Sequence, residues 1–187
     1  MNEFQLHDES TAPEGARETL KQAKAKYGFL PNLLAVMSES PALLKGYLVL
    51  GEVFDKSSFS NTERQVVLLA VSRENDCRYC VAAHSTVAEM TKVPAKVIES
   101  LRQGHPIPDA KLEALRTFVV KVVSSRGWPT DEDIQAFLES GYTRRHILEV
   151  VLGVGYKTLS NYTNHIAETP LDQPFQAKEW EKVGQAV

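Results

Sequence analysis

The sequence has 187 residues, a formal net charge of −3 and 43% apolar residues, which suits one domain, 1–187, with its own core. The small net charge and the lack of a Lys/Arg cluster exclude the electrostatic pattern of a nucleic-acid-binding protein. No apolar run approaches the roughly 18 residues that cross a membrane, and the acidic, polar N-terminus is unlike a signal peptide. We therefore expect a cytoplasmic protein.

Hydrophobic periodicity and capping residues predict an all-α fold. No stretch alternates like a strand, and no Asn-Gly or Asp-Gly pair marks a hairpin. A loose tail is expected at 1–13 and a C-terminal extension at 170–187, with a loop at 170–174 and a short helix or tail after it. Between them the predicted helices lie, in chain order, at 14–27, from about 31, at 42–55, 62–74, 77–90, 94–104, 109–126, 131–139 and 143–168.

The helix starts are predicted from residue types that favour the first turn. Thr62 is the expected N-cap of its helix, with a carboxylate directly behind it. Asn75-Asp76 interrupts the apolar run that follows, and either residue can cap the next helix. Thr143 is the expected cap of the last long helix.

The segment 62–90 holds both cysteines, Cys77 and Cys80, in a Cys-x-x-Cys pair, with His84 four residues after the second. On a helix, Cys80 and His84 share one face, and Cys77 lies at the helix entrance. The free amides of a helix start favour a thiolate, and a nearby imidazole can take the proton. The pattern predicts two sulfurs and one imidazole within a few ångströms of each other.

The chain also shows a weak internal sequence similarity, which predicts a duplicated helix pair, with chance alignment as the alternative. A shift of 81 residues aligns four pairs of positions: Thr62 with Thr143, Arg64 with Arg145, Cys80 with Asn161, and His84 with His165.

Three interpretations of the cysteine pair follow from the sequence. In a reducing compartment a close pair indicates redox work or a metal rather than a structural disulfide, and a dithiol that cycles with a disulfide is favoured. Two buried, inert thiols are the second interpretation. Zinc is the third, but it requires three or four ligands, and only His84 and His165 are available as partners.

A thiol–imidazole relay often has a third, orienting group, and four side chains are candidates. Gln65 lies in the apolar run before the cysteines. Glu63 is expected to serve the helix start, and Glu74 to lie on a solvated face. Glu149 interrupts an apolar run, so it is either a buried relay acid or, as we favour, the partner of an arginine.

Polar side chains recur along the predicted last helix. His165, Asn161 and Asn164 are expected to form hydrogen bonds between helices. Because the internal similarity aligns His165 with His84, a site role is the alternative for them. The remaining histidines, expected at the surface or in loops, are His7, His105 and His146. The tryptophans, expected in packing or subunit contacts, are Trp128 and Trp180.

The stretch 64–84, RQVVLLAVSRENDCRYCVAAH, resembles the carboxymuconolactone decarboxylase/alkylhydroperoxidase D (AhpD-like) family, peroxidase-related branch. The segments FLPN at 29–32, Ser-Pro at 40–41 and KTLSNYTNHIAETPL at 157–171 also resemble that branch, so the likeness covers most of the chain. The resemblance implies an all-helical fold, homo-oligomers (trimers or hexamers), no bound cofactor, and peroxide reduction through the dithiol.

The resemblance also implies roles for individual residues. Cys80 would attack the peroxide, Cys77 would resolve the product, and His84 would relay protons. The family has a glutamate twelve residues before the first cysteine, and this chain has Gln65 there. A glutamine can orient an imidazole but cannot exchange a proton at neutral pH. Hence Glu63, Glu74 or Glu149 substitutes for it, or the relay is shorter.

The expected function is therefore a thiol-dependent peroxidase in antioxidant defence, reduced by a lipoyl- or thioredoxin-type protein. The alternative is a redox-sensing or disulfide-exchange protein without significant peroxide turnover. A zinc-binding interaction module is a third hypothesis. Decarboxylation is disfavoured, because decarboxylase members of the superfamily generally lack the cysteine pair.

Overall fold

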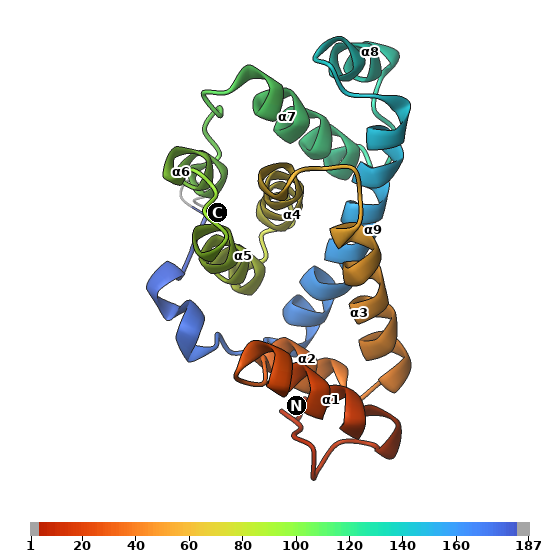
Figure 1. Ribbon diagram of the computed structural model, residues 1–187, viewed down its shortest axis with the longest axis vertical. Helices are drawn as coiled ribbons and strands as arrows, with labels where there is room; N and C mark the ends of the chain where they lie inside the picture. Colours follow the sequence, from red (N-terminus) through yellow and green to blue (C-terminus); the bar gives the residue numbers. More distant parts are fainter. Residues whose placement is uncertain (1–3, 183–187) are drawn as a thin grey trace.

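The computed structural model describes residues 4–182 and confirms the all-α prediction (Figure 1). The described residues contain helices and connecting segments and no strand. The helices are α1 (Glu14–Tyr27), α2 (Asn32–Met37), α3 (Pro41–Asp55), α4 (Asn61–Glu74), α5 (Arg78–Met90), α6 (Ala95–Gln103), α7 (Ala110–Ser124), α8 (Asp131–Glu139), α9 (Arg144–Ala167) and the 3-10 helix η1 (Gln173–Lys178). None of these helices is both long enough and apolar enough to span a membrane.

Helix α4 lies at the centre of the molecule. It packs against α5, α6 and α7 on one side and against α9 on the other, while α3 packs along α9 (Figure 1). Every residue from Gln65 to Ser72 is buried. A helix that is covered all round must be apolar all round, which explains its continuous apolar run. Gln65 is thus held in place by the packing of its own helix.

Two predicted helix starts are wrong by one or two residues. Helix α4 is capped by Ser60, not Thr62, because Ser60 and Glu63 form a reciprocal capping box. Helix α5 has Cys77 at its N-cap instead of Asn75 or Asp76. The expected cap of the last long helix is confirmed, with Thr143 at the N-cap of α9. Side chains also cap α3, α7 and α8, at Ser40, Asp109 and Thr130.

The predicted internal repeat is absent from the fold. Helices α4 and α5 are separated by a tight turn in which Asp76 has a φ of 58°. The corresponding second copy is a single helix of 24 residues, α9. The aligned Thr, Arg and His positions are therefore not evidence of a duplicated helix pair.

The N-terminal segment is held more firmly than the expected loose tail. His7 lies in the loop before α1, as one of the two predicted places, but it is buried and its Nε2 lies 2.5 Å from Glu39 Oε2. The Asp8 carboxylate accepts hydrogen bonds from the backbone of Ser10 and Thr11.

The remaining expected surface and packing residues differ in outcome. His105 is exposed, whereas His146 is half-buried against Phe59, with ring centroids 5.1 Å apart. Trp180 is buried and donates to the Arg102 carbonyl, as expected of a packing residue. Trp128 is 84% exposed, so it does not pack within the chain. Part of the predicted C-terminal extension, 183–187, lies outside the described residues.

Glycine at position 153 allows α9 to approach the core closely. A Cβ there would lie 2.7 Å from Val67 Cγ1 and 2.8 Å from Phe54 Cε2, both buried. We expect Gly153→Ala to lower the free energy of unfolding by about 1–3 kcal/mol, because the core is already full. In Gly155→Ala, where no atom lies within 4 Å of the added Cβ, the free energy of unfolding should rise by about 0.5–1 kcal/mol. Urea denaturation of both variants checks this, and equal effects would contradict the close packing.

Candidate functional site

The consecutive helices α4 and α5 meet α9, which lies far from them in sequence, around the cysteine pair. Helix α4 contributes Gln65, and α5 contributes Cys77, Cys80 and His84. Helix α9 contributes a stripe of buried polar side chains at helical spacing: Lys157, Ser160, Asn161 and Asn164. The structure therefore places both sulfurs against the polar face of α9, where Asn164 contacts each of them, and places His84 against Lys157 of the same face.

Both cysteines are free thiols with almost no exposure to solvent, at 0% for Cys77 and 1% for Cys80. Their neighbours form a mainly apolar cluster that includes Tyr47. Within it, the Asn164 side-chain amide donates to Cys80 Sγ at 3.2 Å and to Cys77 Sγ at 3.8 Å. Ser160 Oγ lies 3.7 Å from Cys80 Sγ. The sulfurs thus have polar partners on one side and apolar packing on the other.

The two thiols have opposite acidities. Burial raises the pKa of the Cys80 thiol, but a hydrogen bond from Cys77 and the charge of Lys157 outweigh it and hold this pKa well below its ordinary value. Ser160 and Asn161 act in the same direction. The hydrogen bond to Cys80, together with burial, raises the pKa of the Cys77 thiol far above its ordinary value. Of the two thiols, Cys80 is therefore the more acidic and Cys77 the less acidic.

His84 lies between Gln65 and Lys157. Its Nε2 is 3.0 Å from Lys157 Nζ, and its Nδ1 is 3.3 Å from Gln65 Oε1. Burial, and then the charge of Lys157, lower the pKa of His84 well below its ordinary value. The imidazole is thus neutral at physiological pH.

None of the three carboxylates considered for the relay hydrogen-bonds to His84 among the described residues. Glu63 holds the start of α4 and also accepts from the Tyr142 hydroxyl at 3.0 Å. Glu149 accepts from Arg145 Nε at 2.9 Å and from Ser58, which is the arginine pairing that the sequence favoured. Glu74 is half-buried beside Arg116. Of the candidates, Gln65 is the one that contacts the imidazole.

The polar residues predicted on the last helix separate into two groups. Asn161 and Asn164 are buried, and Asn161 Oδ1 accepts from Asn75 Nδ2 at 2.9 Å. His165 is exposed, beside Tyr162. Across residues 4–182, no three His, Cys, Asp or Glu side chains are grouped as they would be to hold a metal ion.

Sequence reasoning missed Lys157 and Ser160 as site residues. Lys157 is only 1% exposed, which is unusual for an ammonium group unless it has a partner. The available signal was the spacing of polar residues at 157, 160, 161 and 164, which marks one face of a helix. That stripe could have indicated a buried polar site before the structure was known.

The segment after α9 closes over α5 and fixes its first turn. The Asp172 carboxylate accepts from the Tyr79 hydroxyl and from the backbone N–H of Asn32, the latter at 3.0 Å. Tyr79 in turn accepts from the Leu33 backbone N–H at 3.3 Å. Helix η1 then packs along α5. Tyr79, one of the two residues between the cysteines, is thus tied to the C-terminal segment.

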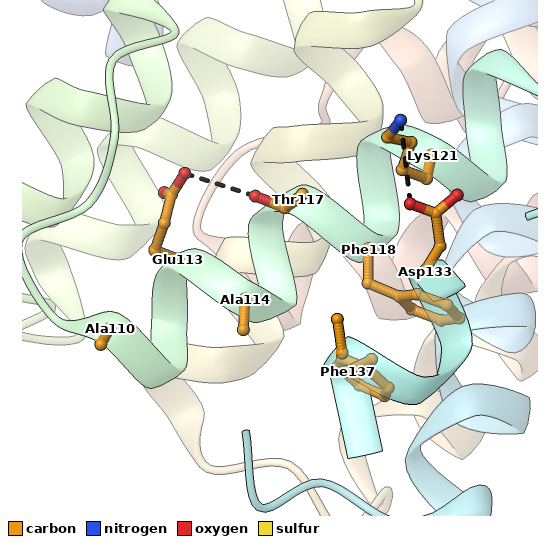
Figure 2. Close-up of a pocket in the computed structure, with 9 residues that line it drawn as sticks. Ala110, Glu113, Ala114, Thr117, Phe118, Lys121, Asp133 and Phe137 are labelled. Atoms are coloured by element: carbon orange, nitrogen blue, oxygen red, sulfur yellow. Dashed lines mark hydrogen bonds and ion pairs between the residues drawn. The ribbon is translucent and has the colours of Figure 1, made fainter. Parts of the chain in front are cut away.

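Two surface hollows lie elsewhere. Figure 2 shows a pocket of about 290 Å³ between α7 and α8, with Glu113, Thr117 and the Lys121–Asp133 ion pair along it. An apolar groove of about 380 Å³ runs between α2, α3 and α9. Neither is lined by the cysteines, so neither is the site of the thiol chemistry.

Comparison with known proteins bears on the family and the fold. Residues 41–119 match the model of the Carboxymuconolactone decarboxylase family. Among curated proteins, none matches the chain.

Solved structures with the same fold cover nearly the whole chain. One is an uncharacterized peroxidase-related protein from Ralstonia eutropha JMP134, described as an alkylhydroperoxidase AhpD core, with 19% identity, a TM-score of 0.82, and coverage of 92% of this chain and 93% of that one. Another is an uncharacterized peroxidase-related protein from Silicibacter sp. TM1040, with 19% identity, a TM-score of 0.77 and coverage of 92% and 91%. A third is the debrominase Bmp8 in complex with 2,3,4-tribromopyrrole, with 17% identity, a TM-score of 0.77 and coverage of 93% and 94%.

The depressed pKa of His84 predicts a pH dependence of stability. The unfolded chain binds a proton at His84 near pH 6.5, whereas the folded chain does so only at lower pH. Acid therefore favours unfolding, and below pH 6.5 the free energy of unfolding should fall more steeply in the native protein than in His84→Gln, by up to about 1.4 kcal/mol per pH unit.

Urea denaturation between pH 5 and pH 7 measures this difference. His165→Gln, at an exposed position, is the matched control and should keep the native slope. Identical slopes for the native protein and His84→Gln would show that the imidazole is not held neutral.

Proposed function

We propose that this protein is a thiol-dependent peroxidase that reduces hydroperoxides. Its fold and the match over residues 41–119 support assignment to the carboxymuconolactone decarboxylase/AhpD-like family. The observation that carries the proposal is a pair of adjacent free thiols of which Cys80 Sγ lies 3.2 Å from the Asn164 amide and 3.7 Å from Ser160 Oγ, with the pKa of Cys80 lowered and that of Cys77 raised. A thiolate is the nucleophilic form of cysteine, and a protonated thiol beside it can resolve the product.

The proposed reaction uses both sulfurs. The Cys80 thiolate attacks the terminal oxygen of a hydroperoxide, an S–O bond forms, the O–O bond breaks, and the leaving alkoxide takes a proton to become an alcohol. Cys77 then attacks the sulfenic acid, so that an S–S bond forms and water leaves. A dithiol reductant exchanges with this disulfide and restores both thiols.

The fold alone does not decide between activities, since one protein of similar fold is a debrominase. The dithiol is what favours peroxide reduction here. Burial of both sulfurs and the glutamine at position 65 are the observations that favour the second candidate, a redox-sensing or disulfide-exchange protein. That protein would form the same disulfide but would not consume peroxide continuously.

The setting proposed with this function is the cytoplasm, where a lipoyl- or thioredoxin-type protein would act as electron donor. A homo-oligomer, trimer or hexamer, belongs to the same proposal. The electron donor and the homo-oligomer follow from the family resemblance at the cysteine stretch.

Hydroperoxide consumption by cysteine variants tests the proposal. With cumene hydroperoxide and a dithiol reductant in excess, we expect steady consumption by the native protein and none by Cys80→Ser, which lacks the nucleophile. Cys77→Ser should react once and stop at the sulfenic acid, which dimedone and mass spectrometry detect. His84→Gln should be slower than the native protein, because it disturbs the thiolate's surroundings.

The control is His165→Gln, which should consume hydroperoxide at the native rate. Native rates in both Cys80→Ser and His84→Gln would end the peroxidase assignment. A single turnover by the native protein, with no continuous consumption under any dithiol, would favour the sensing role instead.

A further inference from the structure

Lys157 is a cation inside the protein with no carboxylate to balance it. Its side chain is 1% exposed, and no ion pair within residues 4–182 includes it. A buried ammonium group is costly unless an opposite charge lies near it. The titratable groups near it are His84, Cys80 and Cys77 on α5 and Tyr156 on α9, whose hydroxyl donates to Tyr47 on α3. Of the thiols and hydroxyls among these groups, Cys80 is the one whose pKa is held well below its ordinary value, in part by the charge of Lys157.

The geometry of α9 places Lys157 beside the sulfur. Asn164 and Ser160, on the same face of α9, both reach Cys80 Sγ. Lys157 lies one turn before Ser160 on that face. Its Nζ reaches His84, which is itself one turn beyond Cys80 on α5. The ammonium group therefore contacts the imidazole and extends from the same face of α9 as the two side chains that contact the thiol.

The hydrogen bonds around His84 fix which group can carry the positive charge. An ammonium group has three donors and no acceptor, so His84 Nε2 must be the unprotonated acceptor in its 3.0 Å contact with Lys157. The imidazole proton is then on Nδ1, facing the Gln65 amide oxygen. A neutral imidazole in this tautomer is not the cation that balances Cys80.

We propose that Lys157 is the cation that keeps Cys80 as a thiolate and holds the proton that the leaving alkoxide takes, with His84 and Gln65 as positioning residues. The proton-donating part rests on the proposed peroxidase function, whereas the ion pair does not. This assignment moves the proton-carrying role from the imidazole to the lysine.

The proton balance closes over one cycle. When the Cys80 thiolate takes the terminal OH group of the hydroperoxide, the alkoxide leaves and accepts a proton from Lys157, which becomes a neutral amine. Cys77 and the sulfenic acid then form the disulfide and release water. A dithiol reduces the disulfide and leaves Cys80 as a thiol, which returns its proton to the Lys157 amine.

The same arrangement accounts for the amide at position 65. A carboxylate there would favour a charged imidazolium at His84, only 3.0 Å from an ammonium group. Two cations at that distance inside the protein would repel each other. An uncharged acceptor such as Gln65 orients the imidazole without adding that charge.

The pH profile of Cys80 alkylation tests the ion pair. We expect Lys157→Met to move the midpoint of iodoacetamide alkylation, located at Cys80 by peptide mass spectrometry, up to that of an ordinary thiol or higher. At pH 7 this means at least a roughly 30-fold slower reaction, since an ordinary thiol titrates near pH 8.5. Lys96→Met, at an exposed position, is the matched control and should keep the native profile.

Two further variants separate the lysine from its neighbours. Lys157→Arg keeps the positive charge, so its midpoint should stay near the native value. His84→Gln keeps the ammonium group, so its midpoint should move much less than that of Lys157→Met. Circular dichroism shows whether Lys157→Met folds. If it does not, folded Lys157→Arg decides: an alkylation midpoint of Cys80 equal to that of an ordinary thiol overturns the proposal. A native profile in folded Lys157→Met, or an equal shift in His84→Gln, also overturns it.

The proton-donating role needs a measurement at a pH where Cys80 is fully ionised in the variant. There, Lys157→Met should still consume cumene hydroperoxide about 100-fold more slowly than the native protein, as expected when a general acid is lost. Equal rates would show that Lys157 does not supply the proton. If the native protein consumes no hydroperoxide, the proposed function fails, but the alkylation profiles still decide the ion pair.

Discussion

The site depends on polar groups that balance one another inside an apolar cluster. Cys80 and Lys157 are almost fully buried, and His84 is enclosed between Lys157 and Gln65. Any one of these groups alone would be costly to bury, because a polar atom removed from water needs a partner. Together they satisfy one another, so the acidity of the thiol is a property of three helices and not of the Cys-x-x-Cys motif.

The packing around α4 makes that arrangement rigid. Helix α4 is covered on all sides, and Gly153 lets α9 approach it closely. The close packing of the buried residues on both helices thereby fixes the distance between Gln65 and the buried polar side chains of α9. Asp172 and Tyr79 hold the first turn of α5 from the other side. Short contacts to the sulfur therefore persist because the backbone around them has little freedom to move.

The all-α fold and the positions of Cys77, Cys80 and His84 on one turn could be read from local signals, because capping residues and helical periodicity act within a few residues. Two helix starts were displaced, since Ser60 forms a reciprocal capping box that a single-residue preference for Thr62 does not reveal. Lys157 could not be assigned, because its role depends on a contact between α9 and α5 that no local pattern encodes. The exposed His165 shows the opposite error, in which sequence likeness to His84 suggested a site role that its exposed position does not support.

The late position of α9 in the chain has a consequence for biosynthesis. Translation proceeds from the N-terminus, so α4 and α5 leave the ribosome before α9 and the segment that carries Asp172. Until those residues emerge, Cys80 has neither the amide of Asn164 nor the charge of Lys157 beside it. The surroundings of Cys80 are therefore completed only when the final helix docks against α5.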